Sequence, residues 1–207
     1  MIYLDYTANT PADPAVLNAF IAAEQRYIAN PNSTHIAGQQ ARAEMDRVTN
    51  SIAQHLGVQP AEIIYTSGAS EANNLAVKGI AQAARHIGKH IISTEWEHSS
   101  VGASLSVLQQ QGYEIDLLRI GRDGRVDLDQ LRELLRDDTV LVAVCAVDSE
   151  LGTVQPIREI AELVKSYPGC RLHVDATQAV GKTELWLDGV DTLSLIHISE
   201  PTRHSLI

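Results

Sequence analysis

The chain has 207 residues, of which 44% are hydrophobic and 20% charged, so it can bury the core of one domain or of two small ones. Its 26 Asp and Glu residues outnumber its 16 Lys and Arg residues, and the formal net charge is -10. A surface of this sign repels phosphate backbones and anionic lipid headgroups. We therefore expect neither a nucleic acid nor a membrane as a partner.

The sequence also lacks the signals of export. It contains no apolar run near the roughly 18 residues that span a bilayer, and the segment from Met1 to Asp5 lacks the basic and apolar regions of a signal peptide. Cys145 and Cys170 are the only cysteines, which is too few for a disulfide framework, and their spacing is not that of a zinc site. These features predict a cytoplasmic protein.

The hydrophobic pattern predicts two helices first and then an alternation of strands and helices. The early helices are expected over residues 16–28 and 41–56, and Gly57 would end the second. The expected strands cover residues 63–66, 90–93, 113–118, 140–146, 171–175 and 191–195. Between them, helices are expected over residues 72–83, from near 98, over 128–135 and over 157–164. This order predicts an α/β fold, a mostly parallel sheet with helices on both faces, preceded by an N-terminal helical segment.

Polar residues follow four of the expected strands, and in such sheets the ligand crevice lies beyond the carboxyl ends of the strands. Within Thr66–Glu71, Gly68 lets the backbone approach a ligand, and the N–H groups of the following helix start favour an anion such as phosphate. A turn with a serine N-cap is the simpler alternative. His98 follows the next strand, where a cap or a surface group is the simpler interpretation. Residues 148–156 form a polar turn in which Pro156 opens a helix.

Asp175 ends a strand that the sequence predicts to be buried, and a buried carboxylate costs free energy unless a cation pairs with it. An arginine, a metal ion and a protonated heterocycle are the three candidates. His173 lies on the same face of the strand, so a His-x-Asp metal pair is one alternative, although no third ligand stands out. Residues 181–183 are similar to the end of a phosphate-binding P-loop, but Ala176 stands where its opening glycine is required. We discard the P-loop interpretation.

Taken together, these junctions resemble the cysteine desulfurases, which are pyridoxal-phosphate enzymes of the class V aminotransferase group with the fold-type I architecture. The resemblance runs from Met1 to about Leu195, roughly the first half of a family member. The matching segments are residues 3–11, 30–35 with Gly38, 41–42, 66–74, 97–98, 152–156 and 173–182. Each segment is weak by itself, and their common order makes the resemblance specific.

The resemblance implies a role for several residues toward pyridoxal 5'-phosphate, whose ring acts as an electron sink. Asp175 would pair with the pyridine nitrogen, and Gln178 would donate a hydrogen bond to the phenolic oxygen. His98 would stack on the ring and relay protons. Ala69 and Ser70 would hold the phosphate. The implied protein is a homodimer that converts L-cysteine to L-alanine and passes the sulfur as a persulfide to an acceptor protein for iron–sulfur cluster or thio-cofactor synthesis.

Two residues depart from the family pattern within the matched segments. Ser70 replaces a threonine and keeps its hydroxyl, whereas Ser149 stands where asparagine is common and could still bind the cofactor. Selenocysteine lyases and true aminotransferases of the same group share most of the motifs and remain alternatives. A non-catalytic half-domain that binds a cofactor or a partner, and a metal-dependent hydrolase built on His173 and Asp175, are alternatives of other classes.

The end of the chain lacks the lysine that in this family forms a Schiff base with the cofactor and moves the substrate α-proton. Residues 196–199, Ile-His-Ile-Ser, stand where the family has a His-Lys pair. Lys182 is no substitute, because the family has a non-catalytic lysine there. The nucleophilic cysteine lies later in the family, so Cys145 and Cys170 are expected to be structural bystanders. We expect the chain as written to be inactive.

Residues 193–203 can also be read as the translation of a transposon-end adapter used in sequencing libraries. We therefore expect the family region, an N-terminal segment with a partial cofactor-binding domain, to cover residues 1–195. Residues 196–207 would then be an artefact without an evolved role. A short diverged protein, whose tail forms a last strand and a turn, is the alternative.

Overall fold

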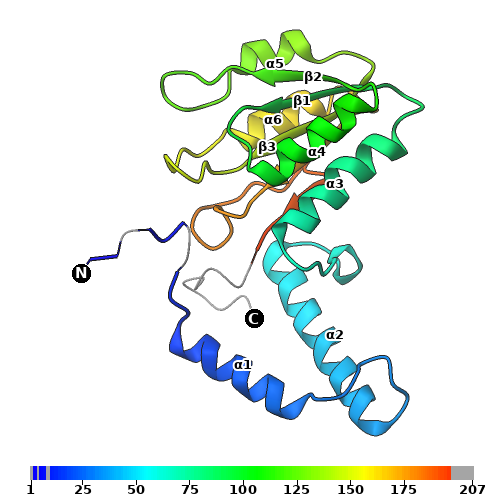
Figure 1. Ribbon diagram of the computed structural model, residues 1–207, viewed down its shortest axis with the longest axis vertical. Helices are drawn as coiled ribbons and strands as arrows, with labels where there is room; N and C mark the ends of the chain where they lie inside the picture. The colour runs from blue at the N-terminus through cyan, green and yellow to red at the C-terminus, as the bar shows by residue number, and fades with distance from the viewer. Residues whose placement is uncertain (1, 4, 8–9, 197–207) are drawn as a thin grey trace. The chain divides into compact units, whose positions relative to one another are not determined.

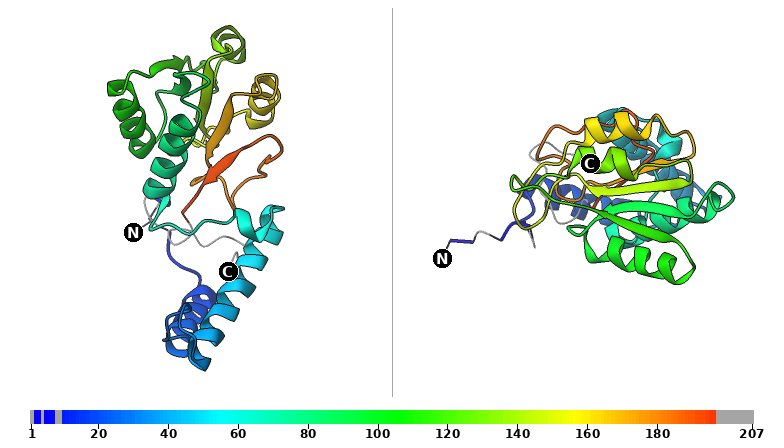
Figure 2. Two further views of the ribbon diagram at one scale, coloured as in Figure 1. Left: turned by 90° about the vertical axis from the view of Figure 1, so that its right-hand side faces the viewer. Right: turned by 90° about the horizontal axis from the view of Figure 1, so that it is seen from above.

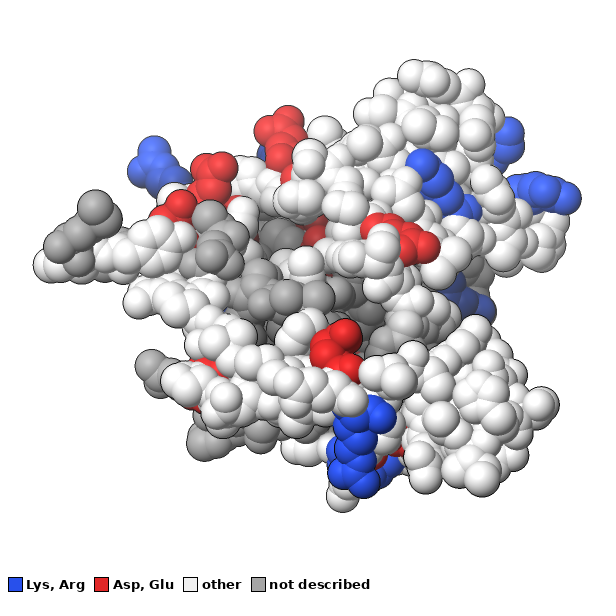
Figure 3. Space-filling view, turned by 60° about the horizontal axis from the view of Figure 1, so that its bottom comes forward, with Lys and Arg blue, Asp and Glu red and all other residues white. Residues whose placement is uncertain are grey.

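The computed structural model describes residues 2–3, 5–7 and 10–196, so the predictions for the tail from His197 onward lie outside the described residues. The chain divides into two compact units, one built on Met1–Tyr65 and the other on Thr66–His197. Within the described residues, no helix combines the length and the hydrophobicity needed to cross a membrane. On the face drawn in Figure 3, the coloured Lys and Arg side chains lie scattered among Asp and Glu and form no continuous basic patch.

The first unit contains the two predicted N-terminal helices, α1 (Pro14–Arg26) and α2 (Ile36–Leu56), and a short 3₁₀ helix at Pro60–Glu62. The helix α2 begins five residues before the predicted start, because Nδ1 of His35 accepts a hydrogen bond from the Gly38 N–H and caps the first turn. It ends where the sequence predicts, at Gly57, whose φ of 68° is readily adopted by glycine.

The predicted strand over residues 63–66 is wrong. These residues have no regular structure, and the side chains of Ile64 and Tyr65 are 70% and 52% exposed. A β-branched run forms a strand only where a neighbouring strand pairs with its backbone groups. None of the strand pairs in the described residues includes this segment.

The second unit is built on a five-stranded sheet with the order β2-β1-β3-β4-β5, and every neighbouring pair is parallel. The strands are β1 (His90–Thr94), β2 (Glu114–Leu118), β3 (Thr139–Cys145), β4 (Arg171–Asp175) and β5 (Thr192–Ser194). Every residue of β1 and of β3 is buried, as expected of central strands covered on both faces. The predicted parallel sheet is confirmed.

Helices cover both faces of this sheet, as Figure 1 and the left view of Figure 2 show. One face is covered by α3 (Ala69–Ala83) and α4 (Ser99–Gln110), which share a core with Ile91 of β1. The other face is covered by α5 (Leu128–Leu134) and α6 (Ile157–Val164), which pack with Val174 of β4. Because side chains alternate along a strand, the neighbours of Val174 in β4 point toward the α3 side.

Candidate active site

The carboxyl ends of the parallel strands bring the predicted site residues to one edge of the sheet. Cys145 at the end of β3 pairs in register with Asp175, and Asp175 pairs with Ser194 at the end of β5. His98 follows the end of β1 and is the N-cap of α4. Ala69 and Ser70 form the first turn of α3. This edge is where an open parallel sheet usually binds its ligand.

Asp175 is buried, with 5% of its surface exposed, and it accepts two hydrogen bonds. Its Oδ2 accepts from Nδ2 of Asn73 at 2.8 Å, and its Oδ1 accepts from the backbone N–H of Thr177 at 3.0 Å. Both donors are neutral. No ion pair found among the described residues involves Asp175. The carboxylate that the sequence predicts to need a cation is therefore buried without one.

His173 lies on the same face of β4 as Asp175, as predicted, and both of its ring nitrogens have partners. Its Nε2 lies 3.0 Å from Oδ1 of Asn73, and its Nδ1 lies 2.9 Å from Oγ1 of Thr192. Burial lowers the pKa of His173 to about 4, so the ring is neutral at physiological pH. No cluster of potential metal ligands occurs in the part of the chain that the structure describes. With both nitrogens engaged, His173 does not support the metal-hydrolase alternative.

His98 is joined to the same side chains through Ser100. Nδ1 of His98 accepts a hydrogen bond from the Ser100 N–H at 3.2 Å and lies 2.8 Å from the Ser100 hydroxyl oxygen. The Ser100 hydroxyl in turn accepts a hydrogen bond from Nδ2 of Asn73 at 2.9 Å. The side-chain amide of Asn73 therefore links His98, through Ser100, to Asp175. The family resemblance implies that His98 and Asp175 contact the same cofactor ring.

Glu97 places a second carboxyl group next to this network. Its Oε1 accepts from the Thr94 hydroxyl at 2.8 Å and from the Cys145 N–H at 2.9 Å, whereas Oε2 is buried without a hydrogen-bond partner. Burial raises the pKa of Glu97 to about 8, and the charge of Asp175 acts in the same direction. Glu97 is therefore mainly protonated at neutral pH.

The two cysteines occupy buried positions in the second unit. Burial, reinforced by the charges of Glu97 and Asp175, raises the pKa of Cys145 well above its ordinary range. Burial likewise raises the pKa of Cys170 to about 12, with the charge of Asp191 adding to it. A thiol with a raised pKa is a weak nucleophile at neutral pH, which agrees with the expected bystander role of both residues.

The start of α3 offers donors for an anion. No side chain caps this helix at Gly68, and the first N–H groups of a helix have no partner within the helix. The hydroxyl of the exposed Ser70 lies in the same turn. The Glu71 carboxylate accepts a hydrogen bond from the Ser67 N–H at 2.5 Å, and this bond lowers its pKa. This arrangement is compatible with the predicted binding of a phosphate by Ala69 and Ser70.

The other two predicted residues lie in loops at this edge. Ser149 is exposed in the turn after β3, where the Asp148 carboxylate accepts hydrogen bonds from the next backbone N–H groups. Gln178 lies three residues beyond Asp175, and its Oε1 accepts a hydrogen bond from Nζ of Lys182 at 2.7 Å. The roles of Ser149 and Gln178 toward a cofactor remain predictions.

Sequence reasoning missed Asn73, Ser100 and Ser194, all of which are buried in this network. A signal for Asn73 was present, because it lies four residues before Val77, a core residue of α3. A polar residue in an apolar helical stripe must find partners inside the protein. Ser100 and Ser194 carry no comparable signal, since serine is common at helix starts and strand ends.

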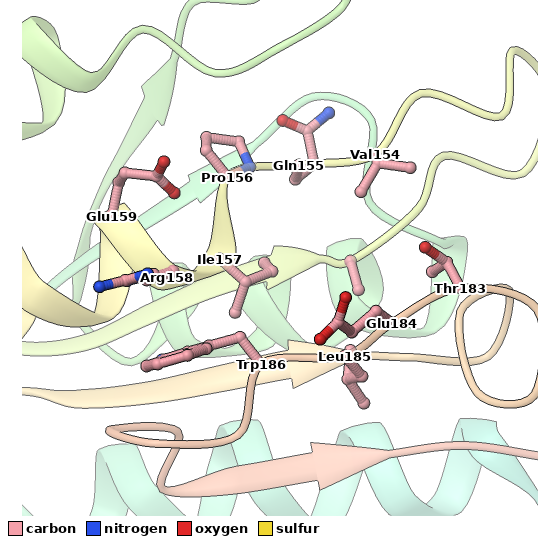
Figure 4. A pocket seen from close by; sticks show the side chains of 11 residues that line it. Val154, Gln155, Pro156, Ile157, Arg158, Glu159, Thr183, Glu184, Leu185 and Trp186 are labelled. Carbon is pink, nitrogen blue, oxygen red and sulfur yellow. The ribbon is translucent and has the colours of Figure 1, made fainter.

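A small pocket of about 160 Å³ lies elsewhere in the second unit, between the start of α6 and the loop over residues 183–186 (Figure 4). The guanidinium of Arg158 lies 4.6 Å from the ring centroid of Trp186 at this pocket. Its lining includes none of the predicted cofactor-binding residues. This pocket therefore does not mark the predicted cofactor site, and the chemistry of the side chains at the carboxyl edge is the better guide.

The residues at the carboxyl edge fit pyridoxal 5'-phosphate. The buried Asp175 carboxylate can pair with a protonated pyridine nitrogen, because both of its hydrogen-bond donors among the described residues are neutral and leave its charge unpaired. The Thr177 hydroxyl and Oε2 of Glu97 are buried polar atoms without partners near the same strand ends. The uncapped start of α3 suits the phosphate.

Comparison with known proteins identifies the family of the chain. The aminotransferase class-V family model matches residues 2–194. The mitochondrial cysteine desulfurase of Arabidopsis thaliana is 43% identical over 182 residues, which cover 87% of this chain and 40% of the plant protein. The cysteine desulfurase IscS of Proteus mirabilis is 43% identical over 199 residues, which cover 94% of this chain and 49% of the bacterial protein.

Solved structures show the same relationship. A NifS-like protein has a TM-score of 0.89 and 32% identity, over 94% of this chain and 54% of the other. SspA in complex with cysteine has a TM-score of 0.87 and 34% identity, over 95% of this chain and 57% of the other. The chain thus spans about half the length of these relatives. Because the family model covers nearly the whole sequence, the chain belongs to the aminotransferase class-V family.

Proposed function

We propose that the protein is a pyridoxal-phosphate-dependent cysteine desulfurase, which converts L-cysteine to L-alanine and passes the sulfur to an acceptor protein as a persulfide. The observation that carries this proposal is the Asp175 carboxylate, buried at the carboxyl edge of the sheet with neutral donors only. It is supported by relatives named cysteine desulfurase and by the structural similarity to SspA, which was solved with cysteine.

In this proposal each residue at the edge has one task. When bound, pyridoxal phosphate supplies an electron sink for the bond changes at the substrate. Asp175 keeps a proton on the pyridine nitrogen, because a buried carboxylate stabilises a neighbouring positive charge. The first turn of α3, with Ala69 and Ser70, holds the phosphate. His98 stacks on the ring face, and Gln178 donates a hydrogen bond to the phenolic oxygen.

Two catalytic groups of the family fall outside this set of residues. The proposal places the lysine that moves the substrate α-proton, and the cysteine that takes the sulfur, beyond residue 195. Residues 196–199 would then not belong to the family domain. Sequencing the genomic DNA past codon 195 tests this point. A His-Lys pair within a few codons supports it, and a stop codon at the end of the present sequence contradicts it.

The activity is tested with the protein encoded by that genomic reading frame, by measuring sulfide released from L-cysteine. Asp175→Ala is expected to lower the rate by at least about a hundredfold, because the pyridine nitrogen loses its charge partner. Asp188→Ala, which removes an exposed carboxylate in the loop before β5, is the matched control and should leave the rate unchanged. Equal rates for the unaltered protein and Asp175→Ala would refute the proposal.

The remaining expectations belong to the same proposal. Comparing L-cysteine with L-selenocysteine as substrate separates a desulfurase from a selenocysteine lyase, and an assay for transfer of the amino group to a keto acid detects an aminotransferase. We also propose a cytoplasmic homodimer, which sedimentation of the complete protein and cell fractionation test.

A further inference from the structure

The side-chain amide of Asn73 is at the centre of the candidate site. It is fully buried in α3 and forms four hydrogen bonds. Its Nδ2 donates to Oδ2 of Asp175 at 2.8 Å and to Oγ of Ser100 at 2.9 Å. Its Oδ1 lies 3.0 Å from Nε2 of His173 and accepts a hydrogen bond from the Ser194 hydroxyl. An amide has two donor and two acceptor positions, so every position is used.

The partners of Asn73 determine which way its amide faces. A carboxylate accepts hydrogen bonds and donates none, so the NH₂ group must face Asp175 and the oxygen must face His173. Nε2 of the neutral His173 ring therefore carries the hydrogen. Its Nδ1 then accepts from the Thr192 hydroxyl at 2.9 Å. The whole arrangement is consistent only with this tautomer of His173.

The same amide reaches His98 through Ser100. Because the Ser100 oxygen accepts from Asn73, its own hydrogen is free to point at Nδ1 of His98, 2.8 Å away. The backbone N–H of Ser100 donates to the same nitrogen. Nδ1 of His98 is thus an acceptor, and these two bonds fix the orientation of the ring.

We propose that Asn73 is a positioning residue of the cofactor site, which fixes the Asp175 carboxylate and, through the Ser100 hydroxyl, orients the His98 ring. This inference rests on the proposed function, in which Asp175 and His98 contact one cofactor ring at its nitrogen and at its face. Because protein groups occupy all four hydrogen-bonding positions of Asn73, its amide would act on the cofactor through Asp175 and Ser100. It acts as outer residues do at metal sites, by holding the groups that make the contact.

A double-mutant cycle on the protein from the genomic reading frame distinguishes positioning from general support of the fold. Dissociation constants for pyridoxal phosphate are measured by absorbance titration for the unaltered chain, Asn73→Leu, Asp175→Ala and the double variant. Asn73→Leu should weaken binding about tenfold when Asp175 is present, the effect of losing one hydrogen bond to a charged group. In the Asp175→Ala background the same change should weaken binding clearly less, because only the link to His98 through Ser100 is then lost.

The controls separate this inference from the proposed function. Gln82→Leu makes the same amide-to-leucine change at an exposed position of α3 and should leave binding unchanged. Equal losses from Asn73→Leu in both backgrounds would overturn the positioning role while leaving the cofactor proposal intact. If the protein from the genomic reading frame does not bind pyridoxal phosphate, or Asp175→Ala does not weaken its binding, the proposed function fails first.

A second measurement needs neither a variant nor the cofactor. Nitrogen-15 NMR of the imidazole rings of the 207-residue chain near pH 7.5 reports which nitrogen of His173 carries the hydrogen. The expected result is a hydrogen on Nε2, pointing at Oδ1 of Asn73. A hydrogen on Nδ1 would mean that the amide faces the other way and cannot donate to Asp175, which overturns the inference.

Discussion

At the scale of single residues, most buried polar groups of the candidate site satisfy one another, and Glu97 and Thr177 are the exceptions among the described residues. Oε2 of Glu97 has no partner, and burial raises the pKa of this carboxyl group to about 8. In the unfolded chain Glu97 loses its proton near the ordinary glutamate pKa of about 4.5, whereas in the folded chain it keeps the proton up to about pH 8. The free energy of unfolding therefore falls as the pH rises between these values.

The variant Glu97→Gln removes this titration while keeping an oxygen that accepts from Thr94 and Cys145. The stability of the variant relative to the unaltered chain should rise between pH 5 and pH 8, by on the order of a few kcal/mol. Urea unfolding at the two pH values measures it. Glu95→Gln, at an exposed neighbouring position, is the control and should show no such trend. A stability difference that is the same at both pH values would contradict the burial of a protonated Glu97.

The residues of the site differ in how far the sequence reveals them. Asp175 was predictable, because it ends an apolar strand and its carboxylate must find partners near that end. Asn73 was not predicted, although it contacts Asp175, because the contact joins residues 102 positions apart. Such a pairing depends on how α3 packs over β4, and the pattern within either element does not contain that information.

At the scale of elements, the buried strands and amphipathic helices were predictable, since each follows from a local pattern. The apolar run of β3 and the stripe of α6 appear where the sequence predicts them. The segment 63–66 has a similar local pattern and forms no strand, because none of the described strands pairs with it. A strand forms only where another strand of the sheet pairs with it, so local composition alone predicts more strands than the fold contains.

Replacing either of two glycines of the second unit by alanine should change the free energy of unfolding, in opposite directions for the two positions. A Cβ added to Gly79, inside α3, would have no atom within 4 Å, so Gly79→Ala should raise the free energy of unfolding by about 0.5–1 kcal/mol. A Cβ added to Gly88, just before β1, would lie 2.1 Å from the carbonyl oxygen of Asp138. Gly88→Ala should lower the free energy by about 1–3 kcal/mol. Urea unfolding measures both, and changes of equal sign would contradict the packing described before β1.

At the scale of the whole molecule, the chain brings the carboxyl ends of β1 to β5 to one edge of the sheet while spanning about half the length of its relatives. The second unit alone holds the Asp175 carboxylate, the His98 ring and the start of α3. Under the proposed function, this unit supplies the residues that would bind the ring and the phosphate of the cofactor. Catalysis itself also requires the lysine and the cysteine that the proposal places beyond residue 195.

The proposed function requires that Asp175 hold a proton on the pyridine nitrogen of pyridoxal phosphate. Nitrogen-15 NMR of the cofactor, labelled at the ring nitrogen and bound to the protein from the genomic reading frame, measures this protonation directly. The account predicts a protonated nitrogen in the unaltered protein and an unprotonated one in Asp175→Ala near pH 8. An unprotonated nitrogen in the unaltered protein, or a protonated one that persists in Asp175→Ala, would contradict it.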